Sequence, residues 1–391
     1  MKINNLKQLT VAAMLLLTAA NVSAKDNIDY VDPFIGTTNF SVCNPGAVRP
    51  HGLMSVVPFN VMGSDINQWD KDKRWWSAPY EYNNKYFTGF AHVTLSGVGC
   101  PEMGTLLTMP TTGELNVDYR SYGSEYTDEV AHPGYYSNRL TKYGIRCEVT
   151  STLRSSVERY TFPKGQGNLL FNLGNGLTNE IGATLRRVSD TEFEGFRLLG
   201  TFCYNPDAVF PMYFVVRVSK QPKKSGYWKK QPEMKGAAAE WDQYSGKYKL
   251  YPRYGRDIAG NDIGYYMTFD CAEETQVEVQ VGVSFVSIAN ARENLEAEQP
   301  VCDFNAVARE ARADWARTLD RVTVEGGTEE QRRVFYTALY HTQIHPTVLQ
   351  DVNGQYPKME GDEILTTKGN RYTVFSLWDT YRNLSQLETL L

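Results

Sequence analysis

The sequence has little of what marks a nucleic-acid-binding, zinc-binding or membrane-spanning protein. Its 391 residues carry 40 Lys and Arg against 45 Asp and Glu, so a formal net charge of -5 supplies no basic surface for DNA or RNA. It has only five histidines, and its six cysteines are irregularly spaced with no Cys-x-x-Cys pair or Cys/His cluster. After Ala24 it has no apolar run long enough to cross a membrane. These absences exclude nucleic acid as a partner and indicate a globular protein.

The N-terminus has the order of a secretory signal peptide. Lys2 and Lys7 precede an apolar run at 11–20, and small residues follow up to Ala24. We therefore predict cleavage after Ala24 and a secreted, periplasmic or cell-surface protein; the alternative is a short buried helix. In an oxidising compartment we expect mainly buried free thiols with room for one disulfide. The spacing selects neither a pairing nor an oligomeric state.

Residues 25–300 have the pattern of many short strands. Aromatic residues make up 13% of the chain, including 25 tyrosines, and aromatic side chains suit a pleated sheet. Polar and apolar residues alternate at 276–285, and short apolar runs occur at 146–153, 168–173 and 210–218. Turn-forming residues separate the runs. We therefore predict a mostly β protein with an N-terminal β-sandwich at 25–300.

After residue 300 the apolar period becomes helical. Val307, Ala311, Trp315 and Leu319 fall on one helical face. This spacing predicts a linker helix within residues 301–323.

A second helix is predicted to open the last part of the chain, residues 324–391. Thr328 followed by Gln331 is a capping-box signature, and Pro346 is expected to end or kink the helix. The chain then stops at Leu391 within an apolar segment that has no polar tail. Because such a segment has an uncovered apolar face, we expect a truncated helical domain.

Eight motifs, each weak alone, follow one another along the chain: Tyr30–Thr37, Pro45–Gly52, Gly89–Cys100, Met109–Gly113, Ala131–Tyr136, Arg159–Pro163, Phe335–Thr342 and Tyr372–Arg382. In this order they closely resemble glycoside hydrolase family 92, the calcium-dependent exo-acting α-mannosidases. The string Ser-Leu-Trp-Asp-Thr-Tyr-Arg at 376–382 is the most specific of them.

The resemblance implies an N-terminal super-sandwich joined by a linker helix to a C-terminal (α/α)6 barrel, of which this chain would hold only the beginning. It implies mannose-containing glycans as partners and hydrolysis of terminal α-linked mannose, with α-1,2 the expected linkage. It also implies a Ca²⁺ ion that distorts the mannose ring. Inversion needs a carboxylic acid on one face of the sugar and a carboxylate with its water on the other. The resemblance places both, and most calcium ligands, beyond residue 382, so no catalytic residue and no metal ligand is assigned here.

Two departures from the family pattern leave the linkage open. Thr94 stands where many relatives have a second histidine. The usual Pro-Phe-Gly is Pro50-His51-Gly52 here.

The resemblance places Asp379 on the mannose hydroxyls and Trp378 in a wall of the pocket. A carboxylate can accept two hydroxyl hydrogen bonds, and an indole face suits the C–H side of a sugar. Arg382, one helical turn on, could orient Asp379 through an ion pair. The alternatives are a helix-capping Asp379, a core Trp378 and an ordinary surface ion pair.

Further candidates lie in loops. His51 and Gly52 are expected to contact sugar from a Gly/Pro-rich loop, whereas His92 is a candidate whose structural role is somewhat favoured. Trp69, Trp75 and Trp76 form an aromatic cluster that suits a glycan platform. His341 and His345 are four residues apart, a spacing that can hold a metal but is better explained by packing of a helix. The competing functions are a non-catalytic mannoside-binding protein and an inactive remnant.

Overall fold

The computed structural model describes residues 25–38, 42–61, 78–97, 102–178, 180–200, 205, 207–234, 236, 243–373 and 377–391. The predicted signal peptide, the Trp69–Trp76 cluster and the cysteines Cys100 and Cys203 lie outside these residues.

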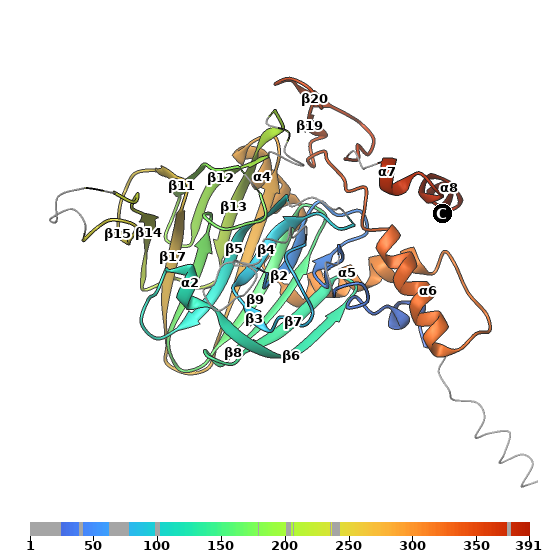
Figure 1. The fold of residues 1–391 in the computed structure, drawn as a ribbon, viewed down its shortest axis with the longest axis horizontal. Coiled ribbons are helices and arrows are strands. Elements are labelled where there is room, and N and C mark those ends of the chain that lie inside the picture. The colour runs from blue at the N-terminus through green and yellow to red at the C-terminus, as the bar shows by residue number, and fades with distance from the viewer. Residues whose placement is uncertain are drawn as a thin grey trace, which may run out of the picture.

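Two large antiparallel sheets form the body of the described molecule (Figure 1). The first has eight strands in the order β1 (Ala47–Val48), β2 (Ser55–Phe59), β4 (Gly89–Thr94), β5 (Met103–Thr112), β10 (Gly165–Asn172), β17 (Ile263–Cys271), β14 (Lys224–Lys230) and β15 (Tyr248–Pro252) within the described residues. The second, counted over the same residues, has ten in the order β16 (Ile258–Gly260), β11 (Ala183–Arg187), β12 (Glu192–Gly200), β13 (Val209–Val218), β18 (Thr275–Ser284), β9 (Ser155–Phe162), β8 (Ile145–Ser151), β7 (Tyr135–Leu140), β6 (Ser124–His132) and β3 (Tyr86–Phe87). Their facing side chains make one large core. The predicted mostly β sandwich is confirmed.

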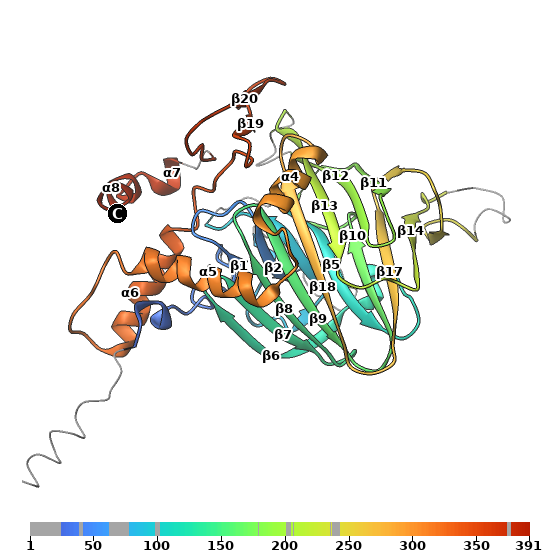
Figure 2. The same ribbon diagram turned by 180° about the vertical axis from the view of Figure 1, so that it is seen from behind.

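Strand β18 is buried on both faces near its end, although its sequence alternation predicted one solvent face. Its valines join the core between the sheets. On the opposite face, α4 (Ile288–Glu298) covers the strand (Figure 2). A Cβ on Gly282 would lie 2.5 Å from the Ala291 carbonyl oxygen and 2.6 Å from the Leu295 Cβ. Glycine at this position therefore permits the close approach of the helix.

The linker helix α5 (Phe304–Leu319) packs as its periodicity predicted. All four residues of the expected face are buried. The Asp303 carboxylate caps the helix by accepting from the Ala306 N–H at 2.9 Å. The helix lies over β8 and β9, as Figure 2 shows. At its C-terminal end the Trp315 indole N–H donates to the Val48 carbonyl at 2.7 Å, which ties the helix to β1.

The second helix, α6 (Glu329–Thr342), begins with the predicted capping box. Gln331 N–H donates to the Thr328 hydroxyl at 3.2 Å, and Thr328 N–H donates back to the Gln331 side-chain oxygen at 2.9 Å. The helix ends before Pro346, as expected.

After α6 the chain returns to the sandwich instead of continuing as helices. Buried Asp351 accepts from the side chains of Ser284, Asn290 and Asn294 at 2.7, 2.8 and 2.6 Å. Burial raises the pKa of this carboxyl despite these hydrogen bonds. Arg154 adds a hydrogen bond to the carbonyl of residue 350 at 2.6 Å. The region predicted as the start of a helical domain is thus only partly helical.

Short elements complete the described chain: η1 (Asn27–Tyr30), α2 (Tyr119–Tyr122), β19 (Gln355–Pro357), β20 (Ile364–Thr366), α7 (Leu377–Thr380) and α8 (Leu384–Leu390). Cys147 and Cys271 are buried free thiols, as expected, and Cys302 is a half-buried one. No helix among the described residues combines the length and apolarity that crossing a membrane requires.

Candidate functional site

The predicted site residue His51 lies in a tight turn at the end of β1, clamped by the chain that follows α6. His51 N–H donates to the Gln343 carbonyl, and Val348 N–H donates to the His51 carbonyl, both at 2.8 Å. Gly52 N–H closes the turn on the Arg49 carbonyl at 2.9 Å. A Cβ on Gly52 would sit 3.2 Å from Arg49 atoms, which leaves almost no space for a side chain. Gly52 therefore shapes the turn that presents His51.

The imidazole of His51 has one nitrogen committed and one available. Nδ1 lies 2.8 Å from the Pro346 carbonyl, which can only accept, so Nδ1 carries a proton. Nε2 lies 3.9 Å from a Glu388 carboxylate oxygen. The ring packs edge-on against Tyr372, with centroids 5.8 Å apart. With about a fifth of its side chain exposed, His51 can offer Nε2 to an external hydroxyl group.

Glu388, which the sequence reasoning did not single out, joins this group, as does Tyr372, which was predicted only as the first residue of a motif. Glu388, on α8, accepts from the Gln343 side chain at 2.9 Å. We call these side chains, with His345, the His51 cluster: His51, Gln343, His345, Tyr372 and Glu388. No local pattern marks Glu388, because its partners are about 45 and 340 residues away along the chain.

His345 stands next to His51 but is held neutral. Its Nε2 accepts the Ser96 N–H at 3.0 Å, so this nitrogen is unprotonated. Burial, followed by repulsion from His51, lowers the pKa of His345 to about 4. Its role is structural, which agrees with the packing interpretation of the His341 and His345 spacing.

The low pKa of His345 predicts a loss of stability on acidification. The unfolded chain binds this proton near pH 6.5 and the folded chain only near pH 4, so the free energy of unfolding falls as pH drops between these values. The full loss is about 3 kcal/mol. Urea unfolding at pH 7 and 4.5 measures it. The control is His345→Gln, whose amide oxygen can still accept from Ser96; an equally steep pH dependence in this variant would contradict the assignment.

A water-sized cavity lies beneath the His51 turn. Its volume is about 10 Å³, which is the space of one water molecule. The apolar residues Val48 and Ile344 line it together with Gly52 and five polar residues: Asn44, Ser55, Thr94, Ser96 and Thr347. The described residues therefore supply one wall of a site here, and not an enclosed sugar-sized pocket.

The predicted residues Trp378, Asp379 and Arg382 lie on the surface around α7. Trp378 is 85% exposed, so in this structure its indole walls no pocket. The expected ion pair between Asp379 and Arg382 is not formed; Arg382 instead donates to the Tyr381 hydroxyl at 3.1 Å. The expectation that Arg382 orients Asp379 is therefore corrected for this structure. Asp379 keeps an exposed carboxylate that can accept sugar hydroxyl groups.

His92 is a core residue in this structure, which corrects the expectation that it is a candidate for sugar contact. The side chain is fully buried, with Nδ1 2.7 Å from the Leu106 carbonyl and Nε2 2.5 Å from a Glu158 carboxylate oxygen. Both ring nitrogens are satisfied inside the sandwich, so none remains for an external ligand. His92 lies on β4, and its side chain is buried in the core. This position excludes the contact with sugar.

The described residues do not fit the expected calcium ion. Among them, no group of three or more His, Cys, Asp or Glu side chains is arranged to hold a metal. Calcium needs six to eight oxygen ligands, as a rule with several carboxylates.

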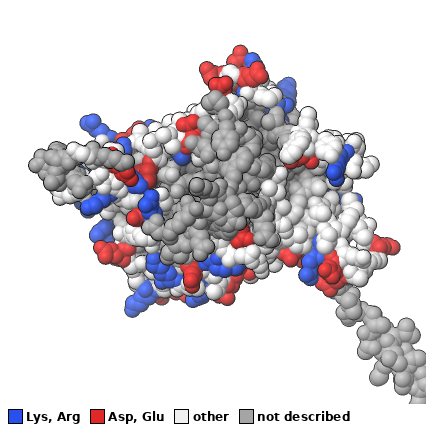
Figure 3. Space-filling view, in the orientation of Figure 1, with Lys and Arg blue, Asp and Glu red and all other residues white. Residues whose placement is uncertain are grey.

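An exposed apolar surface accompanies the site on α6 to α8. Side chains between 38% and 85% exposed form it: Val334, Phe335, Leu377, Trp378, Tyr381 and Leu390. Figure 3 shows few charged side chains on this side of the molecule, at the right. Exposed aromatic and aliphatic side chains in such number are typical of a surface that another structure covers.

Sequence comparison assigns both halves of the chain to one family. The model described as the glycosyl hydrolase family 92 N-terminal domain matches residues 30–284, and that of the family 92 catalytic domain matches residues 290–391. A protein named as an uncharacterized secreted glycosidase, from Arthroderma benhamiae, is 25% identical over 96% of this chain and 48% of its own length.

Solved structures agree with this assignment. The family GH92 alpha-mannosidase of Bacteroides thetaiotaomicron is 27% identical with a TM-score of 0.80, over 93% of this chain and 47% of its own. Its complex with mannoimidazole gives a TM-score of 0.79 at 27% identity, over 93% of this chain and 46% of its own. The chain thus spans about half the length of the relatives it matches.

Proposed function

The chain belongs to glycosyl hydrolase family 92, and from this membership we propose that it supplies the β-sandwich half of an exo-acting, inverting α-mannosidase. The observation that carries the proposal is the match of both family domains, in order, across residues 30–391. The mannoimidazole complex of a structural relative supports mannose-containing glycans as the ligand class. Terminal α-1,2-linked mannose is the expected substrate.

The His51 cluster, Trp378 and Asp379 would contribute to sugar binding and not to proton transfer. His51 Nε2 and the Asp379 carboxylate can accept hydroxyl hydrogen bonds, and the open Trp378 face can cover the apolar side of a mannose ring. Glu388 is held by Gln343 and faces His51. These groups would orient a sugar that the additional region of the relatives encloses from the other side.

The chemical step needs carboxyl groups that we do not assign to this chain. An inverting glycosidase places its acid and base about 6.5–9.5 Å apart, on opposite faces of the sugar. We propose that both carboxyl groups, and the calcium ligands, belong to the region that the longer relatives have in addition to the part matched by this chain. The exposed apolar surface of α6 to α8 would pack against that region. Secretion is proposed from the N-terminal pattern and from the name of the fungal relative.

Release of mannose tests the function. We expect no release from 4-nitrophenyl α-mannoside or α-1,2-mannobiose by the 391-residue chain. We expect calcium-dependent release, abolished by a chelator, when the region found in the relatives follows Leu391. Turnover by the 391-residue chain alone would show that it contains both carboxyl groups. If the longer polypeptide, in which that region follows Leu391, released mannose from no α-mannoside, the result would contradict the proposed function.

The same assay tests Asp379. In the longer polypeptide that releases mannose, Asp379→Asn should lower kcat/KM by about 100-fold or more, because the hydrogen bonds from sugar hydroxyl groups to the charged carboxylate are lost. The matched control is Asp362→Asn, on an exposed turn between β19 and β20, and it should leave kcat/KM unchanged. Equal activity of both variants would remove Asp379 from the site.

A further inference from the structure

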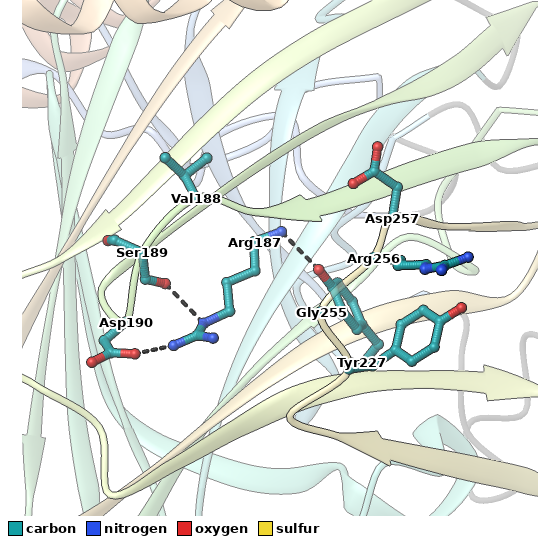
Figure 4. A pocket seen from close by; sticks show the side chains of 9 residues that line it. Arg187, Val188, Ser189, Asp190, Tyr227, Gly255, Arg256 and Asp257 are labelled. Carbon is teal, nitrogen blue, oxygen red and sulfur yellow. Dashed lines mark hydrogen bonds and ion pairs between the residues drawn. The ribbon is translucent and has the colours of Figure 1, made fainter.

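A hollow of about 330 Å³ lies beside β11 and β14 (Figure 4). Figure 1 shows these strands at the end of the sandwich opposite α6 to α8. The two sheets meet at their edges here: β11 and β12 belong to the ten-stranded sheet, and β14 and β15 to the eight-stranded one. Six of the side chains that line it carry the argument: Arg187, Asp190, Tyr227, Tyr254, Arg256 and Asp257. The site proposed for hydrolysis uses none of them.

One wall of the hollow is fixed before any ligand arrives. The hydroxyl oxygen of buried Tyr227 accepts the Arg187 backbone N–H at 2.7 Å. The Arg187 side chain donates to the Ser189 carbonyl at 3.1 Å and forms an ion pair with Asp190. Figure 4 shows Arg187 lying between Asp190 and Tyr227. A wall held in this way loses little conformational freedom on binding.

Asp190 presents an ionised carboxylate at neutral pH. The Gln221 side-chain amide donates to it at 2.7 Å. This hydrogen bond and the Arg187 ion pair hold the pKa of Asp190 below its ordinary value. An ionised carboxylate only accepts hydrogen bonds, and it has more acceptor positions than these two partners use.

Tyr254 supplies an aromatic surface. Its ring meets the Tyr227 ring edge-on, with centroids 6.4 Å apart and planes at 83°, and the Tyr251 ring at 5.9 Å and 62°. Two neighbours therefore position the ring, while 41% of Tyr254 remains exposed. An aromatic face held at a polar rim suits the C–H face of a sugar ring.

The charges of the lining balance, which favours a neutral ligand. The lining contains two arginines, Arg187 and Arg256, and two aspartates, Asp190 and Asp257, which gives a formal charge sum of zero. Arg256 and Asp257 form no hydrogen bond or ion pair with the described residues, so their donors and acceptors are open. For an anion, repulsion by two carboxylates would offset attraction by two guanidinium groups, and an apolar ligand would leave all these groups desolvated. A hydroxyl group both donates and accepts, and so satisfies both kinds of partner.

We propose that this hollow is a second carbohydrate-binding site, which holds one or two neutral sugar residues remote from the site of hydrolysis. Its volume lies at the lower end of the range of about 300–1,000 Å³ for small-molecule sites. Sugar hydroxyl groups bond to Asp190, Arg256 and Asp257. The ring of Tyr254 covers the apolar face. Such a site keeps a polymeric glycan at the enzyme while its terminus is hydrolysed.

Calorimetric or NMR titration of the 391-residue chain with α-1,2-mannobiose and cellobiose tests the site. The use of a mannoside as one probe rests on the proposed function; cellobiose tests sugar binding without that assumption. We expect Tyr254→Ala to weaken binding about tenfold or more, since stacking and its buried area are lost. The matched control Tyr244→Ala removes a 50% exposed tyrosine outside the hollow and should leave binding unchanged.

A failure of both sugars to bind would overturn the second site, as would three other results. The first is equal weakening of binding by Tyr254→Ala and Tyr244→Ala. The second is binding that survives Tyr254→Ala and is lost in His51→Ala, which would place the sugar at the His51 cluster and leave the proposed function standing. The third is displacement of the bound sugar by inorganic phosphate, which would indicate an anion site. Because the readout is binding by this chain, a failure of the mannose-release assay leaves this test intact.

Discussion

His92→Ala should lower the free energy of unfolding by about 3–5 kcal/mol, the usual cost of breaking a buried ion pair. His92 and Glu158 are both fully buried and 2.5 Å apart, and the Tyr160 hydroxyl also donates to Glu158. Removing the imidazole leaves the Glu158 carboxyl with the Tyr160 hydroxyl but without His92, and it leaves the Leu106 carbonyl without its donor. It also leaves a cavity between the sheets. Most domains have only about 5–15 kcal/mol of stability, so the variant should unfold at much lower urea concentration.

Two further variants separate the ion pair from general effects of substitution. His132→Ala changes an exposed histidine of β6 and should shift the free energy of unfolding by less than about 0.5 kcal/mol. The double variant His92→Leu with Glu158→Leu should recover much of the loss, because apolar replacements of buried ion pairs are often neutral. If His92→Ala were no more destabilising than His132→Ala, the buried pair would not support the core.

Trp315→Ala should cost about 3–5 kcal/mol as well, through a different cause. The fully buried indole packs against Tyr340, with centroids 4.4 Å apart, and donates to the Val48 carbonyl at 2.7 Å. It thereby joins α5, α6 and β1 in a small core of their own. Its loss leaves a cavity in this core and removes the hydrogen bond to β1.

The chain contains a matched control for Trp315. Trp378→Ala removes the same side chain where it is 85% exposed, and it should change the free energy of unfolding by less than about 0.5 kcal/mol. Urea unfolding followed by circular dichroism at helical and sheet wavelengths measures both variants. Similar losses for the two tryptophans would show that the α5–α6 core does not depend on Trp315.

The buried face of α5 and the capping box of α6 could be predicted because both depend on residues three or four positions apart. The strands could be predicted because apolar and polar side chains alternate along them. The partner of His92 could not be derived in this way. A structural role for His92 was somewhat favoured from the sequence, but Glu158 lies 66 residues further along the chain. The burial of β18 on both faces likewise depends on a helix that packs across it.

The sequence by itself determined the sandwich, the two helices after it and the family, because periodicity, caps and motifs are properties of neighbouring residues. Only the tertiary structure decided which polar groups meet. His51 faces Glu388, Asp351 ties the chain after α6 to α4, and the sheet edges form the Arg187–Tyr254 hollow. Such contacts join residues tens to hundreds of positions apart. Their distances follow from how the sheets pack, and no local pattern carries that information.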